Sequence, residues 1–96
     1  MIVVAGEALV DLVPTAGGDL APRLGGGPYN VAVAAGRLEA PVSFLSRVST
    51  DLFGDRLVER LHASNVRTDL VQRGDQPTTL AGVGLADDGS ARYSFY

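Results

Sequence analysis

GGGPYNVAVAAGRL, residues 25–38, decides the fold of this chain. Its three glycines permit tight backbone turns, and Pro28 suits the first position of a helix, where its missing N–H costs nothing. The apolar positions that follow are spaced i, i+3, i+4 and i+7, as on one face of a helix: Val31, Ala34, Ala35 and Leu38. The stretch predicts a helix over 28–38 whose apolar stripe faces a sheet.

Extended apolar segments and a second helical pattern lie on either side of this helix. The predicted elements are a long or broken strand over 2–5 and 9–13, a return strand over 21–24, a buried strand over 42–48 and a helix over 52–63 that begins after Thr50 or Asp51 and ends at Asn65. Two further strands, 78–86 and 91–96, flank the turn residues 87–90 and predict a hairpin. This order indicates an α/β sheet with helical crossovers and a small antiparallel flap.

Composition excludes several classes of function. The 96 residues contain no cysteine, one histidine and no lysine, which excludes disulfides, a histidine–cysteine metal cluster, a Walker A loop and Schiff-base catalysis. Eight dispersed arginines and a net charge of −3 provide no basic face for nucleic acid, and no apolar run approaches the ~20 residues that span a membrane. The first segment lacks a basic start and carries Glu7 and Asp11, so we expect a cytoplasmic protein without a signal peptide.

Asp11 is a candidate binding residue. It stands between Val10 and Leu12 in a predicted strand, where a carboxylate needs hydrogen-bond donors. Backbone amides, an arginine or the hydroxyl groups of a polyol ligand would each supply them. Glu7 shares the parity of Asp11 along the strand, but we interpret it as structural.

The GGGPYN segment is a second candidate. The three glycines at 25–27 would let a ligand approach the main chain at the positive end of a helix, and Asn30 in its first turn offers both a donor and an acceptor. A plain tight turn before a helix is the simpler interpretation. A dinucleotide-binding loop does not fit, because its last glycine would fall where Asn30 stands.

The last strand is aromatic, with Tyr93 and Phe95 on one face. That face covers either a ligand or its own hairpin partner. His62 has no neighbour at metal-ligand spacing, so we interpret it as a residue at the solvent boundary of its helix.

Three blocks of sequence, taken together, resemble a known family. AGEALVDLVP at 5–14, GGGPYNVAVAAGRL at 25–38 and APVSFLSRVSTDLFG at 40–54 resemble, in order and spacing, the amino-terminal third of ribokinase-like (PfkB) carbohydrate kinases, especially the fructokinase and 2-keto-3-deoxygluconate kinase branch. The resemblance implies a three-layer α/β/α fold with a small β-hairpin lid. Residues 1–96 would be its amino-terminal sugar-binding portion, with lid strands at about 78–96.

The resemblance also implies roles for single residues. Asp11, Gly26, Gly27 and Asn30 match family positions that bind sugar hydroxyls, and Phe95 matches the place of a lid aromatic that stacks on substrate. No catalytic, cofactor-binding or metal-binding residue is implied, because the family's Gly-Ala-Gly-Asp segment with the catalytic base belongs to a carboxyl-terminal portion absent here. Family members usually have glycine where Glu39 and Ser49 stand.

We therefore expect a sugar kinase whose complete form transfers the γ-phosphate of ATP, with magnesium, to a hydroxyl of fructose or a keto-deoxy sugar acid. The segment alone would bind neither cofactor and would be inactive. The lid strands of this family often mediate dimers, so a homodimer is a further expectation. Two alternatives stay open, a non-catalytic sugar-binding or oligomerising module and a nucleoside kinase of the same fold.

Overall fold

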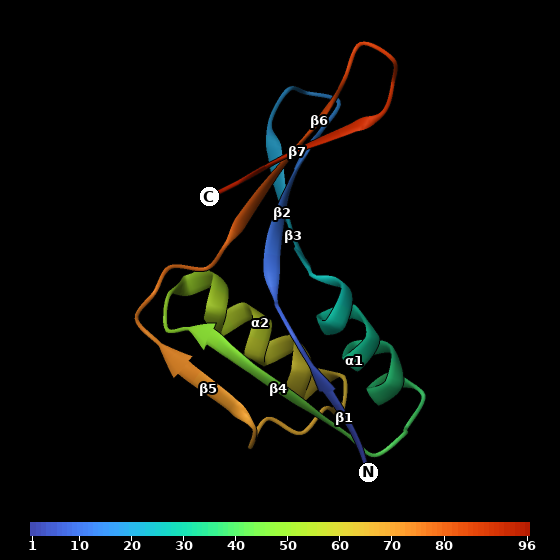
Figure 1. Cartoon of the computed structure of the whole chain (residues 1–96), viewed down its shortest axis with the longest axis vertical. Coiled ribbons are helices and arrows are strands. Elements are labelled where there is room, and N and C mark those ends of the chain that lie inside the picture. The colour runs from blue at the N-terminus through green and yellow to red at the C-terminus, as the bar shows by residue number, and fades with distance from the viewer.

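The computed structural model describes residues 1–96, which form an α/β body and a lid sheet (Figure 1). The body consists of β1 (Ile2–Ala5), α1 (Gly27–Arg37), β4 (Val42–Ser49), α2 (Leu52–Ala63) and β5 (Val71–Gly74). Its strands are parallel in the order β1-β4-β5, with α1 and α2 in the connections between neighbours. The α/β prediction is confirmed, although β5 lies in a segment for which the sequence predicted no strand.

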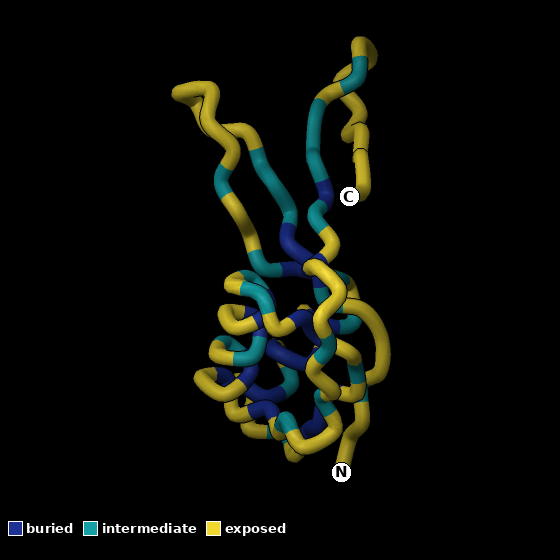
Figure 2. The backbone as a smooth tube through the Cα atoms, turned by 90° about the vertical axis from the view of Figure 1, so that its left-hand side faces the viewer, coloured by how far each residue is buried: buried dark blue, intermediate teal, exposed yellow.

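The lid sheet projects from the body, at the top of Figure 1. Its strands are β2 (Leu9–Pro14), β3 (Leu20–Gly25), β6 (Leu80–Leu85) and β7 (Ala91–Phe95), in the order β3-β2-β6-β7. The predicted hairpin is present as β6 and β7, and the structure adds β2 and β3 to it. Because β2 and β6 pair only at 10–12 with 80–82, the two hairpins diverge toward their tips (Figure 2).

Gly6 is where the chain leaves the body sheet for the lid sheet. Its φ of 149° lies in the region that favours glycine, and a Cβ there would overlap the ring of Pro28. The predicted first strand is therefore broken into β1 and β2, which belong to different sheets. This break carries Asp11 away from the body and toward the three glycines 25–27, called the glycine loop below.

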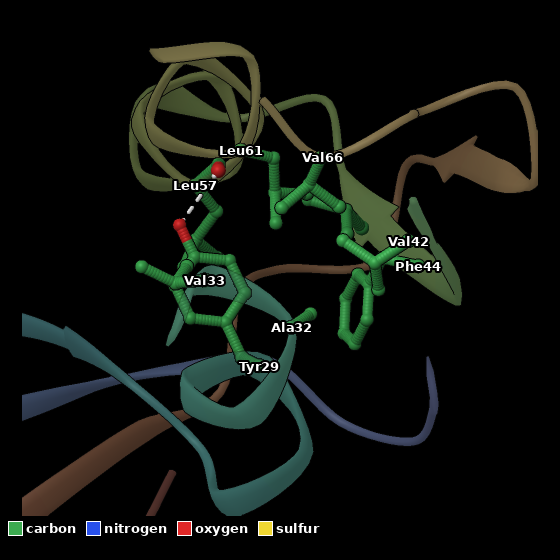
Figure 3. Packing of buried hydrophobic residues seen from close by; sticks show 9 residues of the cluster. Tyr29, Ala32, Val33, Val42, Phe44, Leu57, Leu61 and Val66 are labelled. Carbon is green, nitrogen blue, oxygen red and sulfur yellow. Dashed lines mark hydrogen bonds between the residues drawn. The ribbon is translucent and has the colours of Figure 1, made fainter. Parts of the chain in front are cut away.

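The hydrophobic core lies between both helices and one face of β4 (Figure 3). The buried face of α1 is not the predicted apolar stripe, since Val31 is 58% and Leu38 82% exposed. The residues that α1 buries have the same spacing, shifted along the chain: Tyr29, Ala32, Val33 and Gly36. Gly36 belongs to this buried face because a Cβ there would overlap the backbone of Ser64, so only glycine allows α1 to approach the end of α2 this closely.

Both helices cover the same face of the body sheet. Val4 and Phe44, paired in neighbouring strands, point toward that core. On the opposite face, Val3 and Leu45 remain 51% and 44% exposed. Parallel sheets are usually covered on both faces, so the chain supplies two of the three layers of the expected α/β/α fold.

Both helices end in a residue with left-handed backbone. The N–H groups of Glu39 and Ala40 bond to the carbonyls of Gly36 and Ala35, which is a Schellman motif with Glu39 at φ 64°. At the end of α2, Asn65 has φ 62°, which confirms the predicted stop at this residue. Asparagine tolerates this conformation better than glutamate does, so Glu39 is the more strained of the two.

Replacing Glu39 with glycine is expected to stabilise the protein by about 1 kcal/mol, because glycine adopts a left-handed conformation without the Cβ penalty. Thermal unfolding monitored by circular dichroism measures the change. Asn65→Gly is the matched control and should gain less. An Asn65→Gly variant that gains more than Glu39→Gly would contradict this account of helix termination.

As for a membrane-spanning segment, neither α1 nor α2 has the length and apolar character to cross a bilayer.

Candidate functional site

A cavity of about 310 Å³ lies where the lid sheet meets the start of α1. Its walls come from β2, the glycine loop, the first turn of α1 and the two strands β6 and β7. All five residues predicted to contact a sugar line this one cavity: Asp11, Gly26, Gly27, Asn30 and Phe95. They come from three separate parts of the sequence, so the fold is what brings them together.

Asp11 projects from β2 over the glycine loop. It is half-buried, and its Oδ2 atom would lie 2.7 Å from a Cβ built on Gly25. Arg23 is its cross-strand neighbour on β3, yet the ion pair of this chain is elsewhere, between Arg73 and Asp55. The carboxylate accepts no hydrogen bond from the rest of the chain. It is therefore available to accept hydrogen bonds from ligand hydroxyls.

The two glycines that line the cavity have different constraints. Gly26 has φ 104°, and a Cβ there would lie 2.8 Å from the carbonyl oxygen of Glu7, so this position requires glycine for the fold itself. Gly27 begins α1 and has open space where a side chain would start. No side chain caps this helix, so the N–H of Gly27 remains free at the cavity.

Tyr29 anchors the first turn of α1 from the core side. Its hydroxyl donates a 2.7 Å hydrogen bond to the carbonyl of Leu57, and its ring meets that of Phe44 edge to face at 5.8 Å (Figure 3). Burial raises the pKa of Tyr29 to about 12, against the opposing effect of the Arg60 and Arg37 charges. The hydroxyl therefore stays protonated and keeps donating. This anchor fixes the neighbouring Gly27 and Asn30 at the mouth of the cavity.

Tyr93 and Phe95 form an aromatic pair on the lid side of the cavity. Their rings stack with centroids 6.3 Å apart and planes inclined by 16°. They share one face of β7, as predicted, and both side chains are more than half exposed. A flat apolar surface of this kind can cover the carbon-rich face of a sugar ring.

Four further residues line the cavity besides the five predicted sugar contacts: Glu7, Leu9, Ala81 and Tyr93. Of these, Tyr93 lies on the strand face for which a ligand was one of two expectations. Glu7 was interpreted as structural, but its exposed side chain lies in the β1–β2 turn beside the cavity. Its strand parity with Asp11 was the one sequence signal that pointed here. Ala81 could not be found from sequence, because it reaches the cavity only through the pairing of β6 with β2.

A smaller cavity of about 140 Å³ lies near the carboxyl ends of β4 and β5, and none of the five predicted residues lines it. Among the acidic and histidine side chains, no group of three or more is placed to hold a metal ion. The residues of the larger cavity thus offer hydroxyl-binding groups, an amide and an aromatic surface.

Comparison with known proteins shows what this chain is similar to. The pattern of pfkB family carbohydrate kinases matches residues 1–96. A fructokinase of Rhizobium leguminosarum bv. trifolii is 41% identical over 100 residues, covering 100% of this chain and 30% of that protein.

Solved structures give the same result. The fructokinase of Xylella fastidiosa with bound ATP superposes with a TM-score of 0.85 at 37% identity, over 99% of this chain and 32% of that one. The fructokinase of Vibrio cholerae O395 bound to fructose, ADP and calcium has a TM-score of 0.82 at 29% identity, over 96% of this chain and 31% of that one. The chain therefore spans about a third of the length of these relatives. Since the family pattern extends over every residue from 1 to 96, the chain belongs to the pfkB family of carbohydrate kinases.

Proposed function

We propose that residues 1–96 are the amino-terminal, sugar-binding portion of an ATP-dependent sugar kinase. The observation that carries the proposal is the single cavity lined by Asp11, Gly26, Gly27, Asn30 and Phe95. The complete enzyme would transfer the γ-phosphate of ATP to a hydroxyl of the sugar, and ADP would leave.

Each of these residues has a definite task in the proposal. The Asp11 carboxylate accepts hydrogen bonds from two sugar hydroxyls, and Asn30 both donates to and accepts from a third. The N–H of Gly27 donates to a sugar oxygen, with the positive end of α1 behind it. Phe95 covers the ring. Holding the sugar in one orientation removes much of the entropic cost of aligning its hydroxyl with the phosphate.

The remaining parts of the reaction lie outside these residues. The attacking hydroxyl must lose its proton to a base, and the γ-phosphate needs donors and a metal ion for its developing charge. In this proposal those groups, together with the ATP site, belong to the segment that follows residue 96 in a full-length kinase. The bound ATP of the Xylella relative supports ATP as the donor. Magnesium is the ion we propose to accompany it.

We propose a neutral ketohexose such as fructose as the acceptor, in preference to a keto-deoxy sugar acid. Glu7 and Asp11 place two carboxylates beside the cavity, and no basic side chain of residues 1–96 lines it. An anionic sugar would be repelled by this pair. The names of the fructokinase relatives support the same choice.

The test is sugar-dependent formation of ADP by the full-length protein supplied with ATP and magnesium, across a panel of hexoses, sugar acids and nucleosides. We expect turnover with fructose well above the rate without sugar, and a lower kcat/KM for 2-keto-3-deoxygluconate. Turnover with a nucleoside alone would replace the sugar-kinase proposal by the nucleoside-kinase alternative. The absence of turnover with every compound would reject both.

Association through the lid sheet is a second part of the proposal. Every residue of β7 is exposed, and this strand lies at the edge of its sheet with unpaired backbone groups. Pairing with the β7 edge of another copy would satisfy them. Sedimentation velocity of the full-length protein tests this, and a monomer at all concentrations would reject it.

We also propose that the full-length protein is located in the cytoplasm.

A further inference from the structure

Asp51 connects the α/β body to the start of the lid strand β6. It is the N-cap of α2, where its Oδ1 atom accepts a 2.8 Å hydrogen bond from the N–H of Gly54. The same oxygen accepts a 2.6 Å bond from the hydroxyl of Thr78, and Oδ2 accepts a 2.8 Å bond from the N–H of Thr78. The Asp51 carboxylate therefore caps α2 and also binds Thr78, in the segment before β6.

The surroundings hold this carboxylate in place. The N–H of Asp51 donates to Ser49 Oγ at 3.0 Å, and Thr50 donates its N–H to the carbonyl of Gly74 at 2.8 Å. Thr78 is only 8% exposed. Burial acts to raise the pKa of Asp51, but the hydrogen bonds from Thr78, Gly54 and Ser49 outweigh it and lower the pKa to about 2. The group is therefore charged at neutral pH, which strengthens each bond it accepts.

The segment that Asp51 holds leads directly into the cavity. Thr78 stands two residues before β6, and Ala81 of that strand lines the cavity. Ala81 is in register with Phe95 of β7, so the position of one determines that of the other. Among side-chain hydrogen bonds, only those from Thr78 to Asp51 join the body to the lid segments 9–25 and 77–96. The chain itself also crosses between body and lid at three places: from β1 to β2, from β3 to α1 and from β5 to β6.

We propose that Asp51 is a positioning residue for the sugar cavity, which fixes the start of β6 against α2 and thereby sets Ala81 and Phe95 opposite Asp11 and Gly27. The inference rests on the proposed function only for the identity of the ligand. The mechanical link between Asp51 and the lid sheet is independent of what binds. This role also explains why a buried threonine follows Pro77 at the point where the chain enters the lid.

Asp51→Asn separates this link from helix capping. Asparagine is as good an N-cap as aspartate, so the bond from Gly54 can be kept. In place of Oδ2 the asparagine has an NH₂ group, which is a donor and cannot accept from the N–H of Thr78. The bond between Oδ2 and Thr78 is therefore lost. Asp55→Asn is the matched control, because it makes the same chemical change in the first turn of α2 and affects an exposed ion pair with Arg73. Thr78→Val removes only the hydroxyl bond and tests the link from its other end.

Two measurements on the full-length protein test the proposal. Without sugar, hydrogen exchange at 81–85 in β6 should accelerate about tenfold in Asp51→Asn, with a smaller change in Thr78→Val. In these two variants β4 should exchange at the wild-type rate, and Asp55→Asn should exchange as the wild type does throughout. By calorimetry, the Kd for fructose should rise about tenfold in Asp51→Asn and stay unchanged in Asp55→Asn.

The outcomes distinguish this inference from the proposed function. Wild-type exchange at 81–85 in Asp51→Asn, or equal acceleration in β6 and β4, overturns the positioning role, since the second result indicates general loss of stability. Accelerated exchange confined to the lid sheet supports the link even when the wild-type protein binds no fructose. In that case it is the proposed substrate that fails.

Discussion

Replacing Asp11 with asparagine is expected to weaken sugar binding by the full-length protein by a factor of about 10 to 100. Hydrogen bonds to a charged acceptor contribute about 1.5–3 kcal/mol, and the amide keeps the shape of the side chain but loses its charge and one acceptor. Asp11 makes no hydrogen bond within the chain that the substitution could break. The effect should therefore appear in binding and leave the thermal unfolding temperature unchanged.

Isothermal titration calorimetry with fructose, or with whichever sugar supports turnover, measures this loss. Asp19→Asn is the matched control, since Asp19 is an exposed residue of the turn that joins β2 to β3 in the same sheet. It should bind as the wild type does. If Asp11→Asn also binds as the wild type does, Asp11 does not contact the sugar, and the assignment of this cavity fails with it.

Part of the candidate site could be predicted because its residues give local signals. Three glycines precede a helix start at Pro28, and Asp11 is a carboxylate within an apolar strand, while the resemblance to ribokinase-like kinases singled out Gly26 and Gly27. Each of these signals requires only a few neighbouring residues. The sequence could not predict that these residues line one cavity. That depends on the break at Gly6, which moves β2 out of the body sheet.

The buried face of α1 shows where local patterns are insufficient. Two sets of positions on this helix have the same spacing, and the more apolar set, with Val31 and Leu38, was expected to be inside. The structure buries the other set because partners from elsewhere in the chain favour it. The hydroxyl of Tyr29 is satisfied by Leu57, and Gly36 allows contact with Ser64. Neither partner is visible from the helix sequence alone.

Long-range pairing accounts for the other failures. β5 is short and carries the polar residues Gln72 and Arg73, so it has little strand character until it pairs with β4. The second role of Asp51 depends on Thr78, 27 residues away. Sequence predicted Asp51 correctly as one of two candidate helix caps, but it contained no sign that the carboxylate also holds the lid.

Replacing Gly54 with alanine is expected to destabilise the protein by about 3 kcal/mol or more. Gly54 is the third residue of α2, and a Cβ there would overlap the carbonyl oxygen of Ser49 and lie 2.6 Å from its carbon. Both are backbone atoms at the end of β4, so no side chain can rotate away. The start of α2 would have to move, and with it the core residues Leu57 and Leu61. The better helix propensity of alanine, about 1 kcal/mol, offsets only part of this cost.

Gly27→Ala is the matched control, because it places the same methyl group in the first turn of the other helix. Nothing lies within 4 Å of a Cβ at Gly27, so the thermal unfolding temperature should stay the same or rise. The sugar affinity should nevertheless fall, since the methyl group would occupy the cavity wall that Gly27 forms. Equal unfolding temperatures for the two variants would contradict the close packing of α2 on β4. Undiminished sugar binding by Gly27→Ala would show instead that the ligand does not approach the main chain at this glycine.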